Sequence, residues 1–180
     1  MPTVLLILLI ALILLMAVIL VIQLSLIIYW LRSGVPFVPS KNKVIAAIVD
    51  NFVLYDGAIF YDLGSGDGRV LCVLASQYPK TQFIGYELNP VLYLFSKFFR
   101  KQPNLVFHRK NFFKTDLKNA DYLYVFLYPG LMKKLLLKLK SELKPGAIVF
   151  SNHFNFGDDM KPEKVFPSSR PLESLYVYKF

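Results

Sequence analysis

The first 31 residues contain no charged side chain, and this stretch limits how the chain can fold more than any other feature. From Val4 to Leu26 the residues are nearly all Leu, Ile, Val, Ala and Met, interrupted only by Gln23 and Ser25. A bilayer core about 30 Å thick needs about 20 apolar helical residues, so this stretch is long enough to span it. A cleaved signal peptide would have a basic n-region, a short apolar core and an A-x-A-like site, and the stretch shows none of these. We therefore predict a retained transmembrane anchor over residues 1–31.

The residues that flank the apolar stretch predict which way the anchor lies in the membrane. Tyr29 and Trp30 stand at its C-terminal end, where such rings favour the headgroup layer. Arg32, Lys41 and Lys43 follow closely, whereas no Lys or Arg precedes the stretch. Because basic residues stay on the cytoplasmic side, we expect a single-pass protein whose remaining residues face the cytoplasm, or the matrix if the membrane is mitochondrial.

The charge of the chain is confined to the part after Leu31 and is strongly basic. All 21 basic and 12 acidic residues lie there, so this part carries the whole formal charge of +9. Many of the basic residues fall into two sets: Lys97, Arg100, Lys101, Arg109, Lys110, Lys114 and Lys118, and then Lys133, Lys134, Lys138, Lys140 and Lys144. In a protein held at a membrane, such a surface favours attraction to acidic lipid headgroups over nucleic-acid binding. The one cysteine, Cys72, rules out an intramolecular disulfide, as is typical of a reducing compartment.

Residues 32–57 are predicted to form a linker followed by a helix. Two prolines in the segment 34–40, G-V-P-F-V-P-S, forbid a helix there and favour an extended chain. Ser40 has the residue type and the position of an N-cap for an amphipathic helix that ends near Asp56 and Gly57. The apolar residues on one face of this predicted helix are Val44, Ile45, Ile48, Phe52 and Val53.

From residue 58 to residue 180, short β-type segments alternate with longer helix-type segments. The predicted segments are 58–63, 70–78, 82–87, 90–100, 104–109, 121–127, 131–143 and 147–151, followed by two short strands at 165–167 and 175–180. This alternation predicts one α/β domain, in which a mostly parallel seven-stranded sheet carries helices on both faces. The helical spacing of Phe95, Phe98 and Phe99 favours core packing over a platform on which bases stack.

The most informative stretch follows the first predicted strand, where residues 62–68 read D-L-G-S-G-D-G. A glycine-rich turn between a strand and a helix lets a nucleotide-bearing ligand approach the backbone at the carboxyl edge of the sheet. The dinucleotide fingerprint G-x-G-x-x-G does not fit, because Gly68 comes one residue early and Arg69 stands at the fingerprint position. Asp62 and Asp67 would repel a pyrophosphate, whereas they suit a cationic ligand such as a sulfonium with an ammonium group.

A carboxylate at the end of the second predicted strand completes this pattern. Glu87 lies in the segment 85–90, G-Y-E-L-N-P, twenty-three residues after Gly64. A carboxylate at about this distance accepts hydrogen bonds from the ribose diol of an adenosine ligand. We therefore expect Glu87→Ala to weaken cofactor binding while leaving the fold intact.

Together, these two motifs resemble motif I and its successor in class I S-adenosylmethionine-dependent methyltransferases, which have a Rossmann-like fold. An apolar stretch followed by G-V-P-F-V-P-S and by both motifs is similar to the small membrane-associated lysine methyltransferases of the mitochondrial ATP synthase c-subunit and adenine nucleotide translocase. The similarity extends from about Gly34 to Phe156. It implies S-adenosylmethionine as the cofactor, residues 58–180 as the methyltransferase domain, and a lysine of a membrane protein as the methyl acceptor.

The resemblance also implies roles for individual residues. The cofactor-binding residues that it implies are Asp62, Gly64, Ser65, Gly66, Asp67, Gly68, Glu87, Asn89, Asn111 and Phe112. Asp62 and the glycine turn would surround the methionine part, Glu87 would hold the ribose, and Asn111 with Phe112 would meet the adenine. Tyr128 and Pro129 would line the acceptor site, and Phe37 and Phe154 are further candidate walls of its entrance.

Other functions stay open at this point. The chain fits a methyltransferase that acts on a lipid, a quinone precursor, another small molecule or a nucleic acid, and it fits a module that binds S-adenosylmethionine without turnover. The glycine spacing disfavours a nicotinamide oxidoreductase. No metal ligands are expected, because His108 and His153 lie far apart with no Cys or acid at metal-ligand spacing. The sequence does not predict the oligomeric state.

Overall fold

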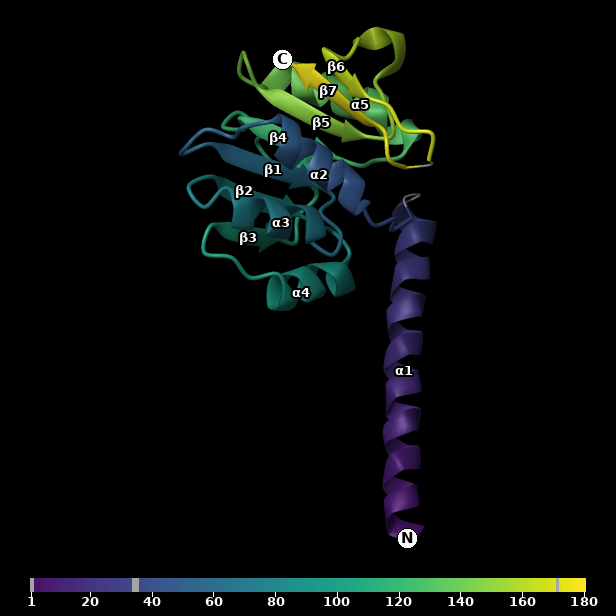
Figure 1. Cartoon of the computed structure of the whole chain (residues 1–180). Helices are drawn as coiled ribbons and strands as arrows, with labels where there is room; N and C mark the ends of the chain where they lie inside the picture. Colours follow the sequence, from purple (N-terminus) through teal and green to yellow (C-terminus); the bar gives the residue numbers. More distant parts are fainter. Residues whose placement is uncertain (1, 34–35, 171) are drawn as a thin grey trace. The chain divides into compact units, whose positions relative to one another are not determined.

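The computed structural model describes residues 2–33, 36–170 and 172–180, and the chain divides into two compact units. The N-terminal unit, Met1–Phe37, contains the helix α1 (Pro2–Ser33), which is continuous over its whole length (Figure 1). By length and composition, Pro2–Leu31 can cross a membrane, and most of its large apolar side chains are exposed. The predicted apolar helix is thus present, whereas the prediction for Gly34 and Val35 falls outside the described residues.

The second unit, Val38–Phe180, is built on one seven-stranded sheet. Its strands are β1 (Ile59–Leu63), β2 (Gln82–Tyr86), β3 (Leu105–His108), β4 (Tyr122–Val125), β5 (Ile148–Asn152), β6 (Lys164–Phe166) and β7 (Leu175–Lys179). The strand order is β3-β2-β1-β4-β5-β7-β6, in which the first five strands are parallel and β7 runs antiparallel to both its neighbours. The predicted mostly parallel, seven-stranded sheet is confirmed.

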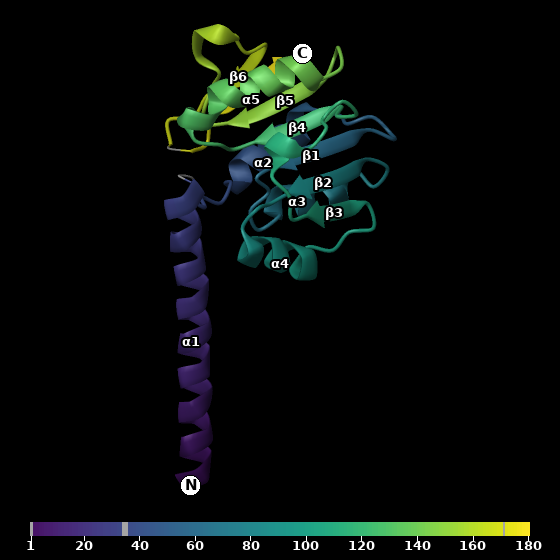
Figure 2. The same cartoon turned by 180° about the vertical axis from the view of Figure 1, so that it is seen from behind.

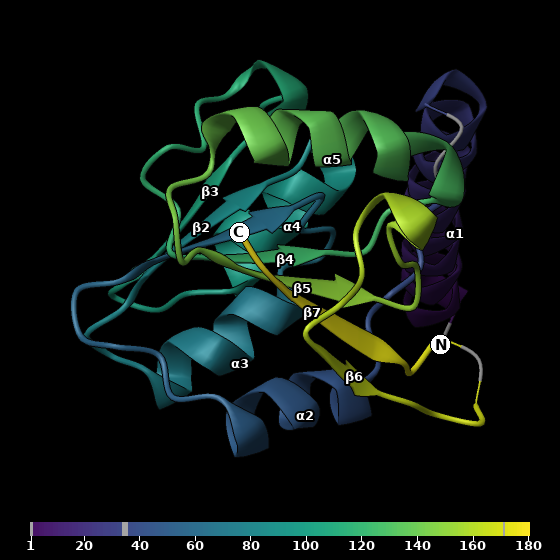
Figure 3. The same ribbon diagram turned by 90° about the horizontal axis from the view of Figure 1, so that it is seen from above.

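Helices cover both faces of this sheet, as predicted. The helices of the unit are α2 (Asn42–Asn51), α3 (Arg69–Gln77), α4 (Pro90–Phe99) and α5 (Pro129–Glu142), with short 3-10 turns at η1 (Phe112–Lys114) and η2 (Gly157–Asp159). α2 and α3 lie on one face and α5 lies on the other (Figure 3), and the reverse view shows α5 in front of the strands (Figure 2). α4 follows β2 and packs beside β3, the edge strand.

The two faces of the sheet bury separate apolar layers because strand side chains alternate between faces. On the face of α2 and α3, the rings of Phe60, Tyr122 and Phe150 stack in parallel, with centroids 6.1 to 6.4 Å apart. The intervening residues Leu63 and Leu123 are fully buried on the other face, beneath α5. Full burial of one such side chain contributes about 1.5 to 3 kcal/mol, so both layers hold the sheet that carries the site.

The segment before the sheet differs from its prediction at Ser40. Helix α2 begins at Asn42, and its N-cap position belongs to Lys41, whose side chain makes no capping bond. Ser40 is buried instead, and its Oγ accepts a 2.8 Å hydrogen bond from the Tyr124 hydroxyl. The N-cap prediction for Ser40 is therefore wrong, because its hydroxyl oxygen is hydrogen-bonded to Tyr124, 84 residues away in the chain, and does not cap the helix.

The predicted apolar face of α2 is right in its first turns and wrong at its end. Val44, Ile45 and Ile48 are almost fully buried against the sheet. The helix ends at Asn51, so Val53 lies beyond it and is 90% exposed. Because the backbone is extended after Asn51, Val53 does not lie on the apolar face, as it would if the helix continued.

The aromatic series on α4 is not part of the core, contrary to its prediction. Phe95, Phe98 and Phe99 are 40%, 58% and 71% exposed, whereas Leu92 and Ser96 face the protein. The helical spacing identified an apolar face correctly, but no other described element of residues 38–180 covers it.

Candidate active site

The glycine-rich turn leaves the carboxyl end of β1, the strand between β2 and β4. The amides of Gly64 and Ser65 both donate to the carbonyl of Tyr86, at 2.9 and 3.0 Å. Since Tyr86 ends β2, these bonds fasten the turn across two neighbouring strands. The backbone of the turn is therefore presented at the carboxyl edge, where α/β sheets bind their ligands.

Gly68 closes the turn in a space too small for any side chain. Its φ is 73°, in the left-handed region that glycine adopts without strain. A Cβ at this position would stand 2.5 Å from the ring of Phe107 and 2.9 Å from Cβ of Ser96. Glycine is thus required twice, by the backbone conformation and by the packing against β3 and α4.

Glu87 ties the turn to the loop that follows β2. Its carboxylate is 7% exposed and accepts hydrogen bonds from the amides of Gly66 at 2.8 Å and Asn89 at 2.7 Å. Burial raises the pKa of Glu87, although these backbone amides oppose the shift. The prediction that Glu87→Ala weakens cofactor binding with the fold intact stays a prediction, and the two buried donors that the substitution would strand add an expected loss of stability.

Asp62 is a buried carboxylate without a compensating group. It is 2% exposed, and the described residues give its side chain no hydrogen bond or ion pair. Burial, followed by the charges of Glu87 and Asp67, raises the pKa of Asp62 well above its ordinary value. A carboxylate kept in such a place destabilises the free protein and provides a site for a cationic group.

Asp67 differs from Asp62, because the protein itself neutralises its charge. Arg69 donates from Nε and Nη2 to both carboxylate oxygens, at 2.8 to 3.0 Å, and Arg100 lies 3.5 Å from Oδ2. Burial alone would raise the pKa of Asp67, but these hydrogen bonds and the two guanidinium charges lower it. Asp67 would therefore repel a pyrophosphate less than a free acid does, whereas its contact with the cofactor stays a prediction.

Ser65 and Asn89 bring polar atoms without partners to the same edge of the sheet. Within the described chain, Ser65 Oγ and Asn89 Nδ2 are buried and have no hydrogen-bond partner. The other amide atom of Asn89, Oδ1, accepts from the amides of Val91 and Leu92, so the residue caps α4. Buried polar atoms without partners are uncommon. The Glu87 carboxylate accepts from the amide of Asn89 itself and from that of Gly66, the residue after Ser65.

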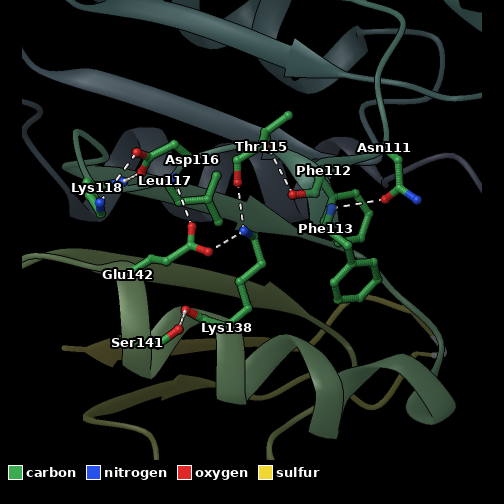
Figure 4. Close-up of polar contacts among 10 residues, drawn as sticks. All are labelled: Asn111, Phe112, Phe113, Thr115, Asp116, Leu117, Lys118, Lys138, Ser141 and Glu142. Atoms are coloured by element: carbon green, nitrogen blue, oxygen red, sulfur yellow. Dashed lines mark hydrogen bonds and ion pairs between the residues drawn. The ribbon is translucent and has the colours of Figure 1, made fainter.

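The predicted adenine-contacting residues lie in a loop that α5 holds in place (Figure 4). Asn111 Oδ1 accepts from the Phe113 amide at 3.0 Å and so caps η1, which contains Phe112. From α5, Lys138 donates to the Thr115 carbonyl at 2.7 Å and to Glu142 at 2.5 Å. Glu142 in turn accepts from the Leu117 amide at 3.0 Å, so one ion pair fixes the loop at Thr115 and at Leu117.

We expect Lys138→Met to loosen this loop. The Lys138 side chain is 10% exposed, so its loss leaves the half-buried Thr115 carbonyl and the Glu142 carboxylate without their partner. The free energy of unfolding should fall by about 1 to 3 kcal/mol, and the cofactor dissociation constant should rise. Lys133→Met is the control, because Lys133 is exposed on the same helix. Equal stability of the two variants in urea titrations would show that the ion pair does not hold the loop.

Aromatic side chains gather after β4 and β5, beside the predicted acceptor site. Tyr128 is 49% exposed, and its ring centroid lies 5.8 Å from that of Phe154. Phe154 also packs against Phe126, with centroids 6.3 Å apart. Pro129 occupies the first turn of α5 immediately after Tyr128. The structure thus brings Tyr128 and Phe154 together, whereas the role of Phe37 stays a prediction.

Sequence reasoning missed the polar residues beneath this edge. Tyr124 and Asn152 are almost fully buried on β4 and β5, and neither amide atom of Asn152 has a hydrogen-bond partner in the described chain. A polar residue at the end of the apolar strand β5 was the available signal for Asn152.

A cavity of about 350 Å³ lies beside the Ser40 segment and is lined by Pro39, Ser40, Lys41, Asn42, Lys43, Arg69 and Glu173.

Comparison with known proteins assigns this arrangement to a family. The family model described as the ANTKMT methyltransferase domain matches residues 62–164, which include the glycine turn, Glu87 and Tyr128. This chain belongs to the ANTKMT methyltransferase family. The family resemblance seen in the sequence is confirmed, and the chain is an S-adenosylmethionine-dependent methyltransferase.

Curated relatives of this ANTKMT family member come from distant organisms. It is 32% identical over 125 residues to the protein-lysine N-methyltransferase of Saccharolobus islandicus, which covers 67% of this chain and 77% of the relative. It is 32% identical over 149 residues to the ATP synthase c-subunit lysine N-methyltransferase of Xenopus laevis, covering 80% of this chain and 63% of the relative. It is 33% identical over 128 residues to the adenine nucleotide translocase lysine N-methyltransferase of Mus musculus, covering 69% and 55%. The chain thus spans 63% and 55% of the length of these two animal relatives.

Solved structures share the fold of this family member. An RNA methyltransferase from Salinibacter ruber in complex with S-adenosyl-L-homocysteine has a TM-score of 0.72 and 25% identity, and the match covers 79% of this chain and 93% of that chain. Human N-acetylserotonin methyltransferase in complex with SAM has a TM-score of 0.51 and 24% identity, covering 62% and 33%, and it supports the fold alone. The predicted Rossmann-like methyltransferase fold is confirmed.

Proposed function

We propose that this chain methylates the ε-amine of a lysine on a membrane protein, and that residues 1–31 anchor it in that membrane. The family match over residues 62–164 carries the proposal. Its relatives from an archaeon, a frog and a mouse are each named lysine N-methyltransferases, although the substrates in the animal names differ. The acceptor atom is therefore the feature that these relatives share, and the substrate protein is the feature that varies.

Several described residues fit the cofactor. S-adenosylmethionine supplies a methyl group already activated by a sulfonium leaving group. The Asp62 carboxylate is buried without a counter-charge and suits the cofactor's ammonium. The hydroxyl of Ser65, three residues further along the chain, has no hydrogen-bond partner among the described residues. Glu87 retains lone pairs for the ribose hydroxyls beyond its two amide bonds. We further propose that Asn111 and Phe112 meet the adenine, since α5 fixes their loop.

The acceptor lysine must lose its proton before it can attack. With a reference pKa near 10.4, deprotonation at pH 7 costs roughly 4 to 5 kcal/mol. Desolvation against aromatic walls disfavours the charged amine and so lowers this cost. We propose that Tyr128 and Phe154 provide such walls, while Pro129 directs Tyr128 at the start of α5. The chain's own task is then to position and desolvate the amine.

We expect Glu87→Ala to reduce both cofactor affinity and stability. Loss of a charge-assisted hydrogen bond to the ribose costs about 1.5 to 3 kcal/mol, or roughly ten- to a hundredfold in dissociation constant. The stranded amides of Gly66 and Asn89 should lower the free energy of unfolding by about 1 to 3 kcal/mol or more. Calorimetry with S-adenosylhomocysteine and urea titration measure the two effects, and the exposed Glu163→Ala is the control. An unchanged dissociation constant would place the ribose elsewhere.

The class of the acceptor is tested by following the methyl group. Membranes that lack this protein are incubated with the purified full chain and methyl-labelled cofactor, and the label is then measured in protein, lipid and RNA fractions. Label in protein supports the proposal. Label in lipid or a quinone precursor, or in RNA as the name of the Salinibacter ruber neighbour suggests for that enzyme, would overturn it. Cofactor binding without any transfer would identify a non-catalytic module.

The anchor is tested by removing it. Eight residues, 34–41, separate α1 from α2, and fully extended they reach no more than about 28 Å. A chain tethered this closely meets membrane proteins at a raised effective concentration. Without residues 1–31, cofactor affinity should stay nearly unchanged while methylation of membrane protein falls sharply. A truncated chain that modifies its substrate at the full rate in salt-washed membranes would contradict the proposed role of the anchor.

A further inference from the structure

Helix α4 presents an apolar face that no other described element of residues 38–180 covers. Leu94, Phe95, Phe98 and Phe99 are 40% to 71% exposed and are spaced so that they share one side of the helix. Leu88, just before the helix, is 41% exposed. Scattered exposed apolar residues are ordinary, but four within two turns of one helix form a patch that indicates an interaction surface.

The other described helices of residues 38–180 lack such a patch. α3 exposes Val73 and α5 exposes Leu137, each as a single large apolar side chain. On α4, in contrast, the rings of Phe95 and Phe99 pack together with centroids 5.0 Å apart. The exposed area is therefore continuous on α4 and isolated elsewhere.

The charge around α4 identifies the partner. Residues 88–115 contain no Asp or Glu, and they contain Lys97, Lys101, Arg109, Lys110 and Lys114 besides Arg100, whose charge pairs with Asp67. Lys97 lies on α4 itself, with its Nζ 5.7 Å from the ring centroid of Tyr93, and Lys101 is the second residue after the helix. Aromatic and apolar residues bordered by Lys and Arg are the signature of a helix that lies in the interface of an anionic bilayer.

We propose that α4 docks on the surface of an anionic bilayer and inserts Phe98 and Phe99 between the headgroups. A second copy of this chain is disfavoured as the occupant, because a two-fold contact would place the same basic residues against each other. A single-stranded nucleic acid is disfavoured because aromatic platforms for bases line basic grooves, whereas this patch lies on the outer side of a helix.

Docking of α4 would bring the cofactor edge to the membrane. The helix begins at Pro90, three residues after Glu87, and its ten residues extend about 15 Å. A helix lying in the headgroup layer therefore holds the carboxyl edge of β2 close to that layer. This contact is independent of the methyl acceptor, and it is distinct from the anchor because it belongs to residues 38–180.

Insertion of α4 into a bilayer is tested by tryptophan fluorescence. Trp30 is its one tryptophan, so residues 38–180, a compact unit with both apolar layers, contain none. Phe99→Trp in this unit should show a blue-shifted emission with vesicles of phosphatidylcholine and phosphatidylglycerol, and quenching by brominated lipid. Leu137→Trp, on the exposed side of α5, is the matched control and should show neither. The same readout in the full chain with Trp30→Phe tests the protein in its own membrane setting.

Binding and its specificity are measured on the same vesicles by flotation. Phe98→Ser with Phe99→Ser should reduce vesicle binding at least about tenfold, whereas Leu137→Ser should leave it unchanged. Circular dichroism and thermal melts of each variant show whether it is folded. Equal binding of both variants, an unshifted Phe99→Trp emission, dimers that disappear with the serine pair, or preferential binding of single-stranded RNA would each overturn the proposal. None of these results depends on methyl transfer, so the failure of one proposal does not imply that of the other.

Discussion

Asp62→Asn is expected to weaken cofactor binding strongly while making the free protein more stable at neutral pH. The substitution removes a carboxylate that burial and the neighbouring acids disfavour, and it keeps nearly the same volume. It also removes the counter-charge that we assign to the cofactor's ammonium. Loss of that contact should raise the dissociation constant of S-adenosylhomocysteine roughly ten- to a hundredfold. Stability and binding thus change in opposite directions, as is common where a binding site requires a charged group that is unfavourably buried in the free protein.

The pH dependence of stability gives the same prediction an independent test. The pKa of Asp62 is raised in the folded protein, so between its ordinary value and the raised value the folded state binds more protons than the unfolded chain. Stability from this group therefore falls as pH rises through that range. Asp62→Asn should remove this fall, whereas the exposed Asp116→Asn should keep it. Urea titrations from pH 4 to pH 8 that show parallel curves for wild type and Asp62→Asn would contradict the account.

Gly68→Ala is expected to destabilise the fold and to abolish productive cofactor binding. Gly57→Ala is its matched control, since Gly57 has a similar φ of 80° but nothing within 4 Å of the added Cβ. Gly57→Ala should cost about 1 to 2 kcal/mol for the left-handed backbone alone. Gly68→Ala adds the overlap with Phe107 and Ser96, which brings the loss to roughly 2 to 5 kcal/mol.

A second substitution separates packing from backbone strain at Gly68. Phe107→Leu removes the ring that the added Cβ would meet, so it should recover part of the stability lost in Gly68→Ala. The same change paired with Gly57→Ala should recover nothing. If Gly57→Ala and Gly68→Ala cost the same in urea titrations, the close packing of the turn against β3 is not what requires glycine.

The fold was predictable because its signals are local. Strands and helices differ in apolar period and in their turn residues, and these patterns placed β1 and α3 within one residue of their positions in the structure. The glycine turn and Glu87 were predictable for a similar reason, since a ligand at a strand end requires particular residue types at fixed spacing. Family recognition then supplied the loop of Asn111, which no spacing rule would have identified.

The remaining features depend on partners that are distant in sequence. Ser40 has the residue type of an N-cap, but a hydrogen bond to Tyr124 decides its role. Asp67 has a local partner in Arg69, but the second guanidinium beside it, that of Arg100, comes from 33 residues away in the chain. For Phe98, periodicity indicates an apolar face and cannot say whether another element covers it. Tertiary contacts, or their absence from the described chain, determine all three.

The identity of the methylated atom tests the proposed function most directly. Membranes from cells that lack this protein are incubated with the full chain and methyl-labelled S-adenosylmethionine, and the labelled protein is hydrolysed to amino acids and chromatographed. The account predicts that the label elutes with methylated lysine and falls at least about tenfold when Asp62→Asn replaces the wild type. Label recovered as methylated arginine or histidine, as a base-labile methyl ester, or outside protein altogether would contradict it.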